Sequence, residues 1–86
     1  MAKGLRIGVA HSTADVVITP YGNAEFDIVV PLPSGAEGFG GWLNGNAVKL
    51  TSMGPGPSGW RMAGTATGSV GSTVSIDANA SYVQSD

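Results

Sequence analysis

An alternation of apolar and polar residues over positions 25–30, interrupted only by Val29, constrains the fold of this chain more than any other feature. One face of an extended segment would carry Phe26, Ile28 and Val30, and the other face Glu25, Asp27 and Val29. Because successive side chains of a strand point to opposite sides, this period of two indicates a strand with one buried face. The β-branched residues 16–18 favour a second strand, and the turn-forming residues 20–23 separate the two. The sequence therefore predicts a β-hairpin over residues 15–30.

Further strands are predicted before and after this segment. Residues 4–9 alternate between apolar side chains and polar or small ones, which predicts a strand at a sheet edge with Arg6 on its polar face. A polar connection is expected over residues 10–14. Residues 42–50 predict a second hairpin, because Asn44-Gly45 is a favoured pair for a two-residue hairpin turn.

The whole chain therefore predicts an all-β fold, a small antiparallel β-sandwich or β-barrel of six to eight short strands with Gly/Pro-rich loops. No segment favours a helix, because apolar residues do not recur at helical spacing and glycine or proline interrupts most windows. With 86 residues, positions 1–86 are expected to form a single domain. Residues 1–10 are expected to supply its first strand or a flexible N-terminal arm.

Two glycine-rich segments are predicted to be exposed loops. Residues 35–41 contain four glycines around Glu37 and Phe39, and residues 54–59 contain three glycines and two prolines. The first segment suggests a phosphate-binding loop, but a dinucleotide-binding fingerprint needs a helix after it, and no helix is predicted. We interpret residues 35–41 as a mobile loop that orders against a partner, with Phe39 as its apolar anchor.

Few side chains could carry chemistry. His11, Ser12 and Asp15 contain the groups of a nucleophilic triad, but a triad must converge in space, so a turn is the favoured interpretation. Four acids could act as paired carboxylates or cation ligands: Glu25, Asp27, Glu37 and Asp77. No loop has the spacing of a cation-binding loop, and one histidine without cysteine argues against zinc. We therefore predict no enzyme, no catalytic residue, no cofactor and no metal.

Aromatic residues are the best candidates for contact with a partner. Aromatic side chains offer large contact areas at modest entropic cost, and the four candidates are Phe39, Trp42, Trp60 and Tyr21. The two tryptophans could equally form the core of so small a domain. Four dispersed Lys and Arg residues give no basic patch, so no nucleic-acid partner is expected. No apolar run approaches the length of a membrane span, so no membrane contact is expected either.

Small size predicts self-association. A chain of 86 residues buries a modest share of its surface, and its 14 glycines raise the entropic cost of folding. The absence of cysteine removes disulfides as a source of stability. We therefore expect a homo-oligomer, either a dimer or a trimer.

The chain resembles small accessory proteins of tailed-phage particles, especially head decoration or cement proteins. The features that carry the resemblance are its shortness, its lack of cysteine and of a signal peptide, and its Gly/Ala/Ser/Thr-rich β pattern with Pro/Gly loops. The resemblance spans the whole chain and assigns no residue a role. It implies a non-enzymatic structural protein of the virion, made in the host cytoplasm, that contacts the major capsid protein. The alternatives are a tail, connector or fibre module of the virion, a cytoplasmic protein, or a carbohydrate- or peptide-binding β-domain that uses Trp42 and Trp60 as platforms.

Overall fold

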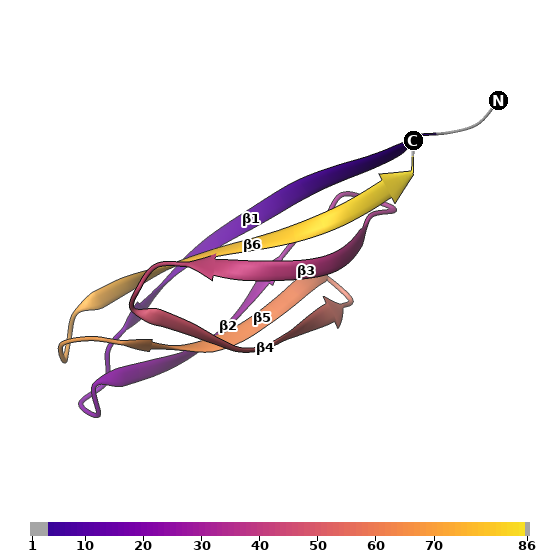
Figure 1. Cartoon of the computed structure of the whole chain (residues 1–86). Helices are drawn as coiled ribbons and strands as arrows, with labels where there is room; N and C mark the ends of the chain where they lie inside the picture. Colours follow the sequence, from indigo (N-terminus) through magenta and orange to yellow (C-terminus); the bar gives the residue numbers. More distant parts are fainter. Residues whose placement is uncertain (1–3, 86) are drawn as a thin grey trace.

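A computed structural model describes residues 4–85, which form six antiparallel strands in two three-stranded sheets (Figure 1). In chain order the strands are β1 (Leu5–Val17), β2 (Asn23–Val30), β3 (Glu37–Asn44), β4 (Val48–Gly56), β5 (Gly59–Thr67) and β6 (Thr73–Ser85). Sheet A has the order β1-β6-β3, and sheet B has the order β2-β5-β4. The described residues contain no helix. The predicted all-β fold is confirmed, and it takes the form of a two-sheet sandwich.

The chain passes between the two sheets at four of the five connections that join the described strands. Only β4 and β5 are consecutive in the chain and adjacent in one sheet. The hairpin predicted over residues 15–30 is therefore wrong, because β1 and β2 lie in different sheets. The hairpin predicted over residues 42–50 is wrong for the same reason. The chain does reverse at the expected glycines, Gly22 and Gly45, with φ of 84° and 120°, but each reversal carries it to the other sheet.

Several segments predicted as connections belong to strands. Residues 10–14 continue β1, which pairs with β6 without interruption, and β3 begins inside the glycine-rich segment 35–41. Residues 54–56 end β4, and the turn after them leads directly into β5. Residues 5–10 pair with β6 and are not a flexible arm, while residues 1–3 of the predicted arm lie outside the described residues.

The glycines of β3 allow its backbone to pack directly on the indole of Trp60. A Cβ atom at Gly38 would overlap Cε3 of that ring, and one at Gly41 would lie 3.1 Å from its Nε1. Trp60 is only 7% exposed and lies in the core between the sheets. Glycine weakens a strand locally, which is why the sequence predicted a loop here, but the close approach of a buried aromatic ring outweighs that cost.

The core lies between the sheets and follows the predicted alternation of β2. Ile28 and Val30 are buried, whereas Glu25 and Asp27 are exposed on the other side of the strand. The buried apolar side chains come from the β1–β2 connection and from strands of both sheets: Ile18, Ala24, Ile28, Val30, Trp60, Met62, Ala66, Ile76, Ala78 and Ala80. The sandwich therefore has one core, and each sheet turns its second face to solvent.

Candidate functional site

The two outer faces of the sandwich differ in chemical character. The outer face of sheet B is charged, with exposed side chains that include Glu25, Asp27, Lys49 and Arg61. Asp27 and Arg61 form an ion pair there. The outer face of sheet A carries large apolar side chains at the end of the sandwich where β1 begins and β6 ends. Because an antiparallel sheet with one solvated face normally alternates apolar and polar residues, the face of sheet A is the exception.

β1 supplies one side of this apolar surface. Leu5, Ile7 and Val9 are 71%, 77% and 55% exposed. Their neighbour Ala10 lies opposite Ala80, a core residue, so the odd-numbered side chains of this segment point outward. The predicted strand is confirmed, but its outer face is the apolar one and not the face that carries Arg6.

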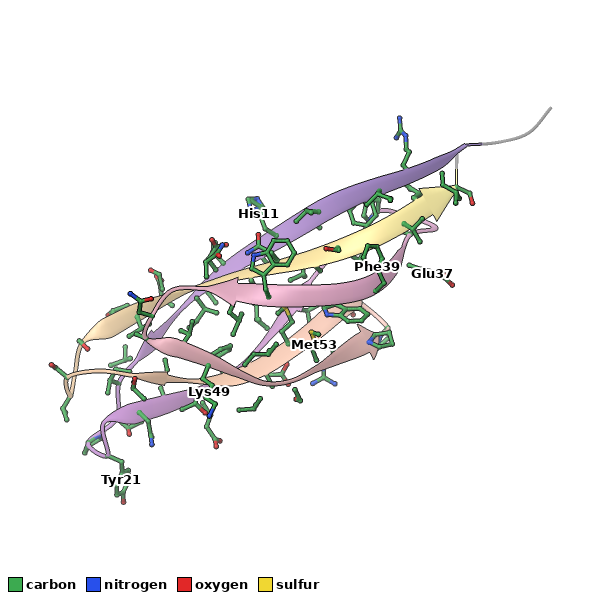
Figure 2. The ribbon with its side chains drawn as sticks, viewed as in Figure 1. His11, Tyr21, Glu37, Phe39, Lys49 and Met53 are labelled. Carbon is green, nitrogen blue, oxygen red and sulfur yellow. The ribbon has the colours of Figure 1, made fainter. Side chains whose placement is uncertain are left out.

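β3 supplies the aromatic side. Trp42 lies opposite Asn79 of the central strand and is 42% exposed. The register shifts between Gly38 and Gly40, so Phe39 occupies a bulge and is 60% exposed. Bulges twist a strand and redirect a side chain, and here the bulge presents the ring at the start of β3 (Figure 2).

These side chains define a single surface that we call the outer patch, whose members are Leu5, Ile7, Val9, Phe39, Trp42 and Val83. Its exposed side chains present on the order of 600 Å² of apolar surface, the upper end of what a monomer usually exposes in one patch. Apart from Val17 at the far end of β1, the rest of the same face is mainly polar. Asn44 donates a 3.1 Å hydrogen bond to Asp77, and Ser75 donates a 2.9 Å bond to Asp15.

Asn79 lies on the central strand β6 at the boundary between the apolar and polar halves. In the register it stands between His11 of β1 and Trp42 of β3. Its side chain is 9% exposed, and its Nδ2 has no hydrogen-bond partner among the described residues. Burying an amide donor without a partner costs about 1–3 kcal/mol. A buried amide donor without a partner therefore lies between His11 and Trp42, at the edge of the outer patch.

Of the four aromatic residues predicted at an interface, the structure brings together two, Phe39 and Trp42. Tyr21 is 91% exposed, but it lies in the connection between β1 and β2, at the opposite end of the sandwich from Phe39 (Figure 2). Trp60 is a core residue, the second of the two roles considered for it. Sequence reasoning missed the contribution of β1, although its alternation was visible, because alternation does not show which face is buried.

The candidate triad does not converge. His11 and Asp15 are exposed on the outer face of β1, four residues apart, which separates their Cα atoms by about 13 Å. Ser12 points to the other face of the same strand. The three groups therefore cannot act together on one substrate atom, and they lie within a strand instead of the predicted turn.

The four acids are divided between the two outer faces. Glu25 and Asp27 share the face of sheet B, as predicted, whereas Glu37 and Asp77 belong to sheet A. Among the described residues, no group of three or more His, Cys, Asp or Glu side chains is placed to hold a metal ion.

Comparisons with known proteins add no relative. Protein-family profiles, curated proteins and solved structures all give no match to this chain. Within residues 4–85, no helix is long and apolar enough to cross a membrane.

Proposed function

We propose that this chain is a non-enzymatic structural protein of a phage particle that docks on the capsid shell through the outer patch. The observation that supports docking is the contrast between the charged outer face of sheet B and the apolar outer face of sheet A. A large apolar patch on a small protein is typical of a surface that a partner covers. Trp42 and Phe39 are the expected anchors, because aromatic residues dominate the binding energy of most interfaces.

The phage shell as partner is supported by the resemblance of the sequence to head decoration and cement proteins. A shell offers many identical sites, so a modest affinity per copy stabilises it when most sites are filled. In this role the protein is made in the host cytoplasm and becomes part of the virion. There it associates with itself and with the major capsid protein.

The carbohydrate-binding alternative is less well supported by the geometry. It used Trp42 and Trp60 as two platforms, but Trp60 is buried in the core and only Trp42 is accessible. A tail, connector or fibre module would use the same patch, so it differs from the proposal in the partner and not in the surface.

Binding to shells tests the proposal directly. The probe is an expanded shell assembled from the major capsid protein of the phage in which the proposal places this chain, and the readout is the number of copies that co-sediment with the shell. We expect Trp42→Ala to weaken binding roughly thirtyfold, the effect of losing about 2 kcal/mol at a binding hot spot. Phe39→Ala should weaken binding in the same direction.

Tyr21→Ala is the matched control, because it removes an even more exposed ring at the far end of the sandwich. It should leave both binding and stability unchanged. Docking through the outer patch would be refuted if Trp42→Ala and Phe39→Ala bound the shell as tightly as the unmodified chain. An equal loss of shell binding by Tyr21→Ala would refute it as well.

A further inference from the structure

The four edge strands of the two described sheets differ in how they are protected from pairing with another chain. Bulges, prolines and charged residues are the usual protections. β3 has its bulge at Phe39, and β4 has a bulge after Leu50 and also contains Pro55. β2 carries two acids within eight residues. β1 pairs with β6 through thirteen residues without a register shift, contains no proline, and has no Asp, Glu, Lys or Arg between Arg6 and Asp15.

The first part of β1 also extends beyond the neighbouring edge of the other sheet. β1 has thirteen residues and β2 has eight, a difference of about 17 Å in length. The connection 18–22 joins them at one end, so the additional length lies at the start of β1, over residues 5–9. Figure 1 shows the start of β1 and the end of β6 reaching past β2 and β5. No strand of sheet B therefore lies beside this part of the edge.

We propose that residues 5–9 of β1 pair with the same residues of a second copy of this chain, antiparallel about a two-fold axis at Ile7. This register places Leu5 opposite Val9 of the second copy and Arg6 opposite Gly8. Apolar side chains then meet on the outer face, and no two like charges stand opposite each other. Cross-strand apolar pairs stabilise an antiparallel ladder, whereas like charges directly opposite destabilise it. The proposal rests on the proposed function, which includes self-association, and it assigns the contact between two copies to the edge of β1.

The pairing would join two copies of sheet A into one continuous six-stranded sheet. Because the two-fold axis is perpendicular to the sheet, both outer patches face the same side. Their combined area is on the order of 1,200 Å², above the roughly 800 Å² that each partner of a typical stable complex buries. A five-residue edge is a small interface, so the dimer is weak in solution and becomes favoured when both patches dock on one shell.

Single cysteines test the register without interference, because the chain contains no cysteine of its own. Directly opposed Cβ atoms in an antiparallel ladder lie close enough for a disulfide. Under mild oxidation of the purified protein, Ile7→Cys should form a disulfide-linked dimer at least about tenfold faster than Val17→Cys, because pairing raises the effective thiol concentration into the millimolar range. Val17 is a matched control: it is exposed on the same face of β1, but in the proposed register two copies of it lie roughly 65 Å apart.

Equal rates for the two variants, or no cross-linking of either, would overturn the proposal. A second measurement uses charge, at a protein concentration high enough for the weak dimer of the unmodified chain to be detected by sedimentation. There Ile7→Lys and Ile7→Glu should each sediment as monomers, and their equimolar mixture should regain at least the dimer fraction of the unmodified chain. A mixture that stays monomeric would also overturn it. Neither experiment contains a shell, so both test edge pairing separately from docking. If they fail while Trp42→Ala still loses shell binding, edge pairing is rejected and docking through the outer patch stands.

Discussion

The packing of β3 on Trp60 makes the strongest prediction about stability. Gly38 and Gly40 lie two residues apart on one strand, and both are glycines without a positive φ. A Cβ atom at Gly38 would lie 3.0 Å from Cζ3 of Trp60 and overlap Cε3, whereas one at Gly40 would meet nothing within 4 Å. Alanine at the two positions should therefore have opposite effects on the free energy of unfolding.

The magnitude follows from the room around the indole. Carbon atoms pack best at 3.5–4.0 Å, so Gly38→Ala must displace the ring by about 1 Å. The ring is 7% exposed and is also bounded by Gly41, so it cannot move without disturbing the core. Overpacking of this kind costs about 1–3 kcal/mol. Gly40→Ala should instead stabilise the fold by about 0.4–1 kcal/mol, because alanine restricts the unfolded chain.

Urea unfolding followed by tryptophan fluorescence measures both variants. They should differ by about 1.5–4 kcal/mol, or roughly 6–30 °C in Tm for a domain of this size. Repeating Gly38→Ala in a Trp60→Leu background removes the atoms that clash, so the penalty should shrink by about 1 kcal/mol or more. Equal unfolding midpoints for the two alanine variants, or an unchanged penalty in the Trp60→Leu background, would refute the packing argument.

Two further predictions concern polar groups. Asp27→Asn should lower the free energy of unfolding by no more than about 1 kcal/mol, because Asp27 and Arg61 are both half exposed. The loss should be smaller in 1 M salt, which screens the ion pair. A loss above about 2 kcal/mol in urea titrations would contradict this. Asn79→Leu should unfold at the same or a higher urea concentration, because it removes a buried amide donor without a partner. A clear fall in the midpoint would show that the amide is satisfied in solution.

The all-β character of the chain and the two faces of β2 could be predicted from local sequence. The period of two in β2 identified its buried and exposed faces correctly, because burial of one face is what selects that pattern. Strand partners could not be predicted in the same way. The turn residues near Gly22 and Gly45 specify where the chain reverses, but not whether the next strand enters the same sheet or the opposite one.

The glycine-rich part of β3 shows the limit of local propensity. Residues 35–41 read as a loop because glycine is unfavourable in strands. The reason for Gly38 lies in the ring of Trp60, a residue of another strand in the other sheet, and Gly41 faces both that ring and the backbone of Asn79. Local sequence was equally insufficient to predict the whole outer patch. Phe39 and Trp42 could be selected as aromatic anchors, whereas the contribution of β1 depends on which side of sheet A faces the core.

The position of β6 determines the order in which the fold can be completed. It is the sixth strand in the chain, yet it lies in the centre of sheet A, between β1 and β3. During synthesis, β1 and β3 therefore emerge without a pairing partner, and sheet B, whose strands all precede β6, lacks the layer that covers its apolar face. We expect ribosome-bound chains that lack residues 73–85 to remain open to proteases until the last strand is released. Because contacts between distant parts of the chain must then form together, folding should be a single late step instead of a growth from the N-terminus.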